Sequence, residues 1–400
     1  MKKIMIILIT VFSVLVVGAG VSAGLLLTKD KWYHKSNTKK LEKAYQKSAS
    51  DLDNEKIYKF EEYTDANGTQ GYKITAYTGS DTKITIPETY CDKPVLRIDN
   101  GVFKNNETLE SLHFYVDDGR ETTGTLTEIG AEAFQNAIAL QSIEFPTSLV
   151  KIEEYAFNGC SALGYIYTEK SSKCMLQTIG DYAFADAGTS SFSFYISDKL
   201  QTIGDYAFKG STVGNLSYNY SGSSDTVKSQ LTSIGDYAFN ASSIRSIDFS
   251  YFVNLQTIGN CAFMNCSSLN SVDLTSCSSL TEIKGYAFSG SNVSYVYLPN
   301  KEGITIGERA MESNYSGGLT VHMKQLPASM DIYNGMRINI NYSSVDYNMA
   351  IRFVDMIVNG FTKTGNSGQN TVYLYVSPGI KTEVQNYLNN NSITSISLQS

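Results

Sequence analysis

The sequence predicts a repeat solenoid of about nine coils, because one nonapeptide pattern recurs at short intervals along most of its 400 residues. The segment LQTIGDYAF occurs twice, at 176–184 and at 200–208. Looser copies of the pattern L-x-x-I-x-x-x-A-F precede and follow these two. Alternating apolar and polar residues follow most of the copies. These features outweigh the usual expectation that a chain of this length forms two or three globular domains.

The last apolar residue of each copy is an anchor, and successive anchors are 23 to 31 residues apart. Most steps are close to 24 residues, within the range of about 20–29 that is typical of leucine-rich repeats. Buried in register, each phenylalanine would contribute about 1.5–3 kcal/mol, so the anchors are expected to form one continuous core column. The anchors are Phe103, Phe134, Phe157, Phe184, Phe208, Phe239, Phe263, Phe288 and Met311.

Each unit also contains one short strand. Segments such as LQSIEF (140–145) and LNSVDL (269–274) alternate apolar and polar residues. Alternation directs Ile143 to one side of a strand and Glu144 to the other. The IGDYAF stretch before each strand suggests a glycine turn followed by one helical turn. Stacked coils would therefore bring their strands together on one side of a leucine-rich repeat array.

The units resemble BspA-like, or treponemal-type, leucine-rich repeats. The pattern I-G-x-x-A-F-x-x-C-x-x-L-x-x-I-x-[LIF]-P of that family is matched by KIEEYAFNGCSALGYI and TIGNCAFMNCSSLNSVDL, and the segment 72–98 looks like the start of such an array. The resemblance covers roughly residues 70–325. It implies a surface-exposed protein that binds or adheres to host proteins, cells or other microbes. It identifies no ligand, since repeat arrays of this kind serve many partners.

The N-terminus carries two lysines followed by 24 uncharged residues, 4–27. As a helix this run would be about 36 Å long, enough for a hydrocarbon core of about 30 Å. Small residues at 21–23 also suit signal-peptidase cleavage, but cleaved signals have apolar runs of only about 7–15 residues. We therefore expect a signal anchor over residues 1–28, with membrane contact through 4–27 and the repeats outside the cell. Secretion after cleavage is the alternative.

Three further segments are expected after the anchor. Residues 29–60 are lysine-rich and suggest a basic linker or stalk. Residues 61–326 are expected to form the solenoid, and residues 327–400 a small α+β cap. Within the cap, 344–361 suggests a helix, and the remainder suggests strand, helix and strand. Without the lysine-rich N-terminus, residues 48–400 carry 23 basic and 37 acidic residues, a net charge of −14. This charge disfavours nucleic acid as a partner.

The sequence contains no pattern that indicates catalysis. Its three histidines, at 34, 113 and 322, lack metal-ligand spacing. No G-x-S-x-G, phosphate-binding glycine loop or HExxH motif occurs. We therefore expect neither an enzyme nor a cofactor nor a metal site. A hydrolase of wall polymers would require acidic residues to converge in a pocket.

Two recurrent polar positions have structural interpretations. Cys160 and Cys266 stand where other coils have Ala or Ser, so we expect buried thiols rather than disulfides, although six cysteines in an exported chain also permit a disulfide. Asp181, Asp205 and Asp236 share one position, which suggests caps for the following turn. The alternative is an acidic ladder that binds calcium.

The candidate binding surface is the row of residues that point outward from the strands. Tyrosine recurs there, and tyrosine is favoured at interfaces because it combines a large rigid area with a polar tip. The alternative is that exposed strand residues are simply good β-formers. We expect protein binding or adhesion to an extracellular protein or cell-surface macromolecule, or otherwise a structural spacer or envelope scaffold. The row consists of His113, Glu144, Tyr167, Tyr195, Ser217, Asp248, Asp273, Tyr297 and His322, flanked by Tyr165 and Tyr295.

Overall fold

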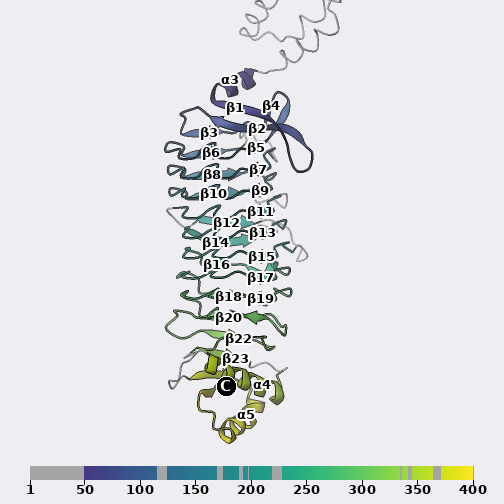
Figure 1. Ribbon diagram of the computed structural model, residues 1–400, viewed down its shortest axis with the longest axis vertical. Coiled ribbons are helices and arrows are strands. Elements are labelled where there is room, and N and C mark those ends of the chain that lie inside the picture. Colours follow the sequence, from purple (N-terminus) through teal and green to yellow (C-terminus); the bar gives the residue numbers. More distant parts are fainter. Residues whose placement is uncertain are drawn as a thin grey trace, which may run out of the picture.

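The computed structural model forms one elongated column of stacked coils (Figure 1). It describes residues 49–114, 124–168, 174–188, 192–196, 198–218, 228–333, 336–340, 345–363 and 371–399. The expected signal anchor, its membrane contact through 4–27 and most of the basic linker lie outside the described residues. Among the residues that the structure describes, no helix is long and apolar enough to cross a membrane.

The N-terminal end of the column is closed by a hairpin. Helix α3 (Ala49–Ile57) leads into β1 (Tyr58–Thr64), which pairs antiparallel with β2 (Gln70–Tyr77). Strand β5 (Lys93–Ile98) then pairs parallel with β2, and the short β4 (Thr89–Tyr90) lies against β5. Residues 49–60, expected to be the end of a linker, therefore belong to α3 and β1.

A two-residue strand in every coil continues the sheet that β1, β2 and β5 begin. Each of these strands ends in the buried isoleucine of the L-x-x-I motif and pairs parallel with its counterpart in the next coil. The sequence had indicated only one strand per coil, so this second ladder of strands was not predicted. Its members are β7 (Glu128–Ile129), β9 (Lys151–Ile152), β11 (Thr178–Ile179), β13 (Thr202–Ile203), β15 (Ser233–Ile234), β17 (Thr257–Ile258), β19 (Glu282–Ile283) and β21 (Thr305–Ile306).

Glycine follows the isoleucine where neighbouring coils approach closely. A Cβ atom on Gly235 would lie 2.5 Å from the carbonyl carbon of Gly204, and one on Gly259 would lie 2.5 Å from that of Gly235. Real Cβ atoms do not come this close to backbone, so only glycine fits at this separation.

The stretch before each anchor is a turn with one left-handed residue, rather than the helical turn that the sequence suggested. Tyr182 and Tyr206 have φ angles of 56° and 58°. The turn directs backbone N–H groups to the next coil, since Tyr182 N donates to Asp205 O at 2.9 Å and Phe184 N to Ala207 O at 2.7 Å. A left-handed residue costs about 1–2 kcal/mol. These hydrogen bonds offset that cost, as does stacking of the tyrosine rings at 4.5 Å.

The predicted phenylalanine column is confirmed. All eight rings are buried, and successive rings stack with centroids 4.8–5.4 Å apart and planes within 4–9° of parallel. Met311 is buried at the end of the series. Cys160 fills the predicted small buried position, where its thiol donates to Phe134 O at 3.1 Å and burial raises its pKa to about 12. The coils thus share one continuous apolar core.

The longer strands line one side of the column, which we call the strand face (Figure 1). They form three parallel sheets, β3-β6-β8-β10, β12-β14-β16, and one that begins β18-β20-β22. The short η2 helix (Phe249–Tyr251) follows β16. The strands are β3 (Lys83–Thr85), β6 (Ser111–His113), β8 (Ser142–Phe145), β10 (Tyr165–Thr168), β12 (Phe192–Ile196), β14 (Val213–Tyr218), β16 (Ser246–Ile247), β18 (Ser271–Asp273), β20 (Tyr295–Tyr297) and β22 (Thr320–His322).

The C-terminal region forms the predicted small cap and also extends the strand face. Strands β23 (Arg337–Asn339), β24 (Val372–Tyr375) and β25 (Ile396–Gln399) continue the sheet of β22 in parallel register. Helices α4 (Tyr347–Lys363) and α5 (Pro378–Asn390) pack together at this end of the column. The repeat motif therefore ends near residue 326, but the strand face continues to 399.

Candidate functional site

The strand pairing aligns the predicted row of outward residues. Parallel strands in register place equivalent side chains on one face about 4.8 Å apart. The side chains of Tyr167, Tyr195 and Ser217 lie outside the described part of the structure, although their strands are described. The paired members are Glu144 with Tyr167, Tyr195 with Ser217, Asp273 with Tyr297, and Tyr297 with His322.

The N-terminal part of this row is polar. His113 Nδ1 lies 3.5 Å from Glu144 Oε2, with 48% and 25% of the two side chains exposed. An exposed pair of this kind contributes about 0–1 kcal/mol to stability. Tyr165 flanks the row opposite Ser142 and is 62% exposed. Among the described side chains, this part of the strand face therefore offers polar groups and the projecting ring of Tyr165.

Asp248 lies one residue beyond the end of β16, and its backbone N–H still donates to Leu216 O of β14 at 3.4 Å. It follows β16 and caps η2, because its Oδ1 accepts from Ser250 N at 3.1 Å and from Ser250 Oγ at 2.5 Å. Asp273 ends β18 in a similar arrangement, accepting from Thr275 N at 3.0 Å and Oγ1 at 2.6 Å. Both carboxylates are thus engaged by their own loops.

Three predicted residues meet in an aromatic cluster near the C-terminal end of the strand face. The Tyr297 and His322 rings stack at 4.3 Å, and Tyr295 lies 6.0 Å from His322. Burial lowers the pKa of His322, which keeps the imidazole neutral at pH 7. The Nε2 atom of His322 is buried and has no hydrogen-bond partner in the described structure.

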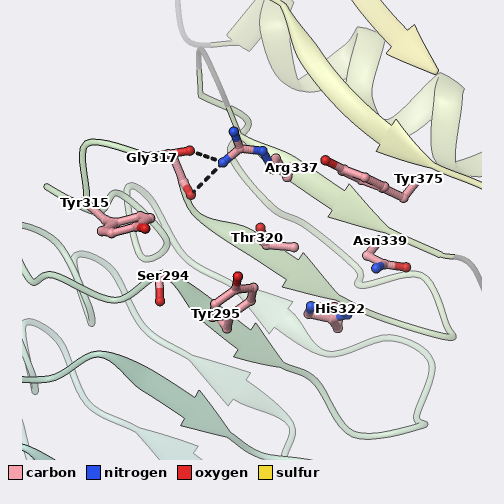
Figure 2. A pocket seen from close by; sticks show the side chains of 10 residues that line it. Ser294, Tyr295, Tyr315, Gly317, Thr320, His322, Arg337, Asn339 and Tyr375 are labelled. Atoms are coloured by element: carbon pink, nitrogen blue, oxygen red, sulfur yellow. Dashed lines mark hydrogen bonds between the residues drawn. The ribbon is translucent and has the colours of Figure 1, made fainter. Parts of the chain in front are cut away.

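A pocket of 380 Å³ opens beside this cluster (Figure 2). It forms because Thr320 stands in register between two long side chains, Tyr295 on β20 and Arg337 on β23. The short Thr320 side chain leaves a depression between them. The lining residues are Ser294, Tyr295, Tyr315, Gly317, Gly318, Thr320, His322, Arg337, Asn339 and Tyr375.

Arg337 is the residue of this lining that carries a full charge at pH 7. Its Nη1 donates to the carbonyl oxygens of Gly317 and Gly318, in the loop before β22. Its guanidinium carbon lies 5.5 Å from the centre of the Tyr373 ring, within the range of a cation–π contact. These contacts fix the guanidinium group at the edge of the pocket, as Figure 2 shows.

The sequence missed several lining residues because the repeat motif ends before them. Arg337, Asn339 and Tyr375 lie in the segment interpreted only as a cap. Their signal is the same alternation that marks the repeat strands, in MRINI at 336–340 and VYLYV at 372–376. In both segments the apolar residues of the strands are buried.

The recurrent aspartates hold successive coils together. Asp181 Oδ1 accepts from Asp205 N at 2.8 Å, and Asp205 Oδ1 accepts from Asp236 N at 2.7 Å. Each carboxylate therefore caps the next coil rather than its own turn. Among the described residues, no group of three or more His, Cys, Asp or Glu side chains is placed to hold a metal ion.

Comparison with known proteins identifies the repeat. A family model described as the BspA type leucine rich repeat region matches in six copies, over residues 73–215 and 177–317. No curated protein matches the chain in sequence. A leucine-rich repeat protein from Bacteroides ovatus is 17% identical, with 86% of this chain and 98% of that chain covered and a TM-score of 0.37. The T. pallidum leucine rich repeat protein is 16% identical, with 77% and 94% covered and a TM-score of 0.23. A leucine rich cell surface protein from Faecalibacterium prausnitzii is 18% identical, with 72% and 88% covered and a TM-score of 0.32.

Proposed function

The chain belongs to the BspA-type leucine-rich repeat proteins, and from this premise we propose that it binds a macromolecule outside the cell through its strand face. The uncharged segment 4–27 would anchor it in the cell membrane as a single-pass protein, with the repeats extracellular. The role is protein binding or adhesion. One observation carries the proposal: the in-register row of outward residues leads into an open pocket with aromatic walls.

The distribution of exposed apolar side chains supports this surface. Among the described residues, five large apolar side chains are exposed, and three of them are tyrosines on or beside the strand face. These are Tyr165, Tyr295 and Tyr315, exposed by 62%, 46% and 44%. Rigid, partly polar aromatic groups of this kind form the energetic centres of many interfaces.

The chemistry of the pocket favours binding over reaction. Its ten lining residues contain no carboxylate that would act as a general acid or base. Within the described structure, no hydrogen bond joins His322 to a hydroxyl nucleophile. We therefore propose a non-enzymatic protein without a cofactor.

Adhesion of cells that display the full chain tests the proposal. The variant combines Tyr165→Ser, Tyr295→Ser and Tyr297→Ser, and the surfaces are coated with extracellular-matrix protein or mucin. Loss of three aromatic contacts is expected to weaken adhesion by at least about tenfold. The matched control is Thr202→Ala with Thr305→Ala, two exposed positions on the two-residue strands. Equal adhesion of wild type and the tyrosine variant, at equal display, would favour the spacer or scaffold function instead.

A further inference from the structure

We propose that the pocket beside β22 binds a sugar residue that carries a carboxylate, at the end of a glycan. The inference rests on the proposed function, because it names the class of macromolecule that the strand face holds. It follows from three properties of the pocket: aromatic walls above a polar floor, one fixed cation, and one unpartnered ring nitrogen.

The walls and floor match the two sides of a sugar ring. A pyranose has an apolar face of C–H groups and a rim of hydroxyls. Tyr295, Tyr315 and Tyr375 provide flat aromatic surfaces from three separate elements, as Figure 2 shows. Thr320 and Asn339 place a hydroxyl and an amide between them. A small ligand is oriented by a few polar groups that are placed among aromatic side chains.

Arg337 selects for a negative charge. The part of the chain that the structure describes places no carboxylate within ion-pair distance of its guanidinium group. The group is already held by two backbone carbonyls and by the Tyr373 ring, so little conformational entropy is lost on binding. A planar guanidinium presents a fork of N–H donors that matches the two oxygens of a carboxylate. In a body of net charge −14, this local cation distinguishes the pocket from the surrounding surface.

His322 supplies an acceptor for a ligand hydroxyl. Its Nε2 is buried without a partner, and burial lowers its pKa, so the ring is neutral at pH 7. In the tautomer that is protonated on Nδ1, Nε2 accepts a hydrogen bond. The stacked Tyr297 ring fixes the imidazole plane. Nε2 is closed to solvent in the described structure, so a ligand hydroxyl would reach it once the neighbouring side chains shift on binding.

A sugar fits better than an acidic peptide side chain. The volume of 380 Å³ is near the lower end of the range of about 300–1,000 Å³ for small-molecule pockets. The long side chains of Tyr295 and Arg337 stand on either side of the depression, whereas an extended peptide needs an open groove. The floor consists of polar side chains, with no apolar recess for a neighbouring peptide residue.

The experiment compares sugars that differ only in the carboxylate. Oligosaccharides ending in glucuronic, galacturonic or mannuronic acid are immobilised beside counterparts ending in glucose, galactose or mannose, and binding of the full chain is measured. At least one acidic sugar should bind at least about tenfold more tightly than its neutral counterpart, because charge-assisted hydrogen bonds are the stronger kind. Arg337→Gln should remove this difference. Equal binding of acidic and neutral sugars, or an acid preference that survives Arg337→Gln, would overturn the proposal.

Two further variants cover the case in which Arg337→Gln fails to fold. Tyr295→Ala removes a wall residue that is 46% exposed, so the fold tolerates it, and binding of the acidic sugar should fall at least about tenfold. Thr202→Ala, at an exposed position of β13 away from the strand face, should leave sugar binding unchanged. Unchanged binding in Tyr295→Ala overturns the proposal.

Failure of the inference is distinguishable from failure of the proposed function. An acidic peptide that binds while every sugar fails would exclude the sugar and leave a protein partner for the strand face. Adhesion that depends on the tyrosines, without any sugar binding, would likewise exclude the sugar and leave a protein partner for the strand face. If neither adhesion nor sugar binding differs between the wild type and the variants, both proposals fail.

Discussion

Replacing Phe208 with alanine tests how the coils are held together. The ring is fully buried and stacks between Phe184 at 5.2 Å and Phe239 at 5.1 Å. A core Phe→Ala change costs about 3–5 kcal/mol, through lost burial and the cavity left behind. Two stacked contacts, each worth about 0.5–1.5 kcal/mol beyond burial, place Phe208 at the upper end of that range.

The same change should also reduce cooperativity. Each coil contacts only its neighbours, so a cavity at Phe208 weakens the coupling between the two halves of the column. Urea unfolding, followed by circular dichroism, is expected to shift to lower urea and to separate into two transitions. Phe288→Ala is the matched control, because its ring stacks on Phe263 alone and its other neighbour along the column is Met311. A loss below about 1 kcal/mol for Phe208→Ala, with one unchanged transition, would refute the continuous column.

Three further predictions concern charge, thiols and caps. Arg97→Met should cost about 3–5 kcal/mol at pH 7, because it leaves Glu128 and Glu153 without their guanidinium partner, bound at 2.7 and 2.8 Å. Burial alone would raise the pKa of Glu153, but hydrogen bonds from Arg97 lower it from 4.5 to about 2. This stability is present above about pH 4.5 and lost as the pH falls toward 2, so the variant should lose less on acidification in denaturation experiments. Asp205→Ala should cost about 1 kcal/mol in urea unfolding, by removing the cap on the next coil; an unchanged midpoint would argue against the inter-coil cap. A thiol-alkylating reagent should modify half-buried cysteines before buried ones, as mass spectrometry of timed samples would show; early modification of Cys160 would contradict the buried core. The half-buried thiols are Cys91 and Cys174, and the buried ones Cys160, Cys261, Cys266 and Cys277.

The repeat made much of the fold predictable from sequence. Once Phe184 and Phe208 stand at equivalent positions 24 residues apart, stacking in register follows, and the strands must align as well. The same logic placed Tyr297 beside His322 on the strand face. Strand β16 ends at Ile247, one residue before Asp248, because a local hydrogen bond from Ser250 to Asp248 competes with continuation of the strand.

The remaining features depend on contacts between coils that no single repeat displays. The left-handed turn at Tyr206 is unfavourable alone and is stabilised only by hydrogen bonds and stacking with adjacent coils. The pocket depends on Thr320 lying between Tyr295 and Arg337, three residues separated widely in sequence. Register between the last repeat and the non-repetitive C-terminal strands cannot be obtained from the motif, because the motif has ended.

Amide hydrogen exchange of the full chain, with and without mucin that bears acidic glycans, tests binding through the strand face most directly. Binding at the pocket is expected to slow exchange in the loop and strand 313–322 and in 336–340, while the two-residue strands β13 and β15 on another side of the coils remain unchanged. Slower exchange confined to those two-residue strands or to the turns before the phenylalanine anchors, or no change anywhere despite bound mucin, would contradict binding through the strand face.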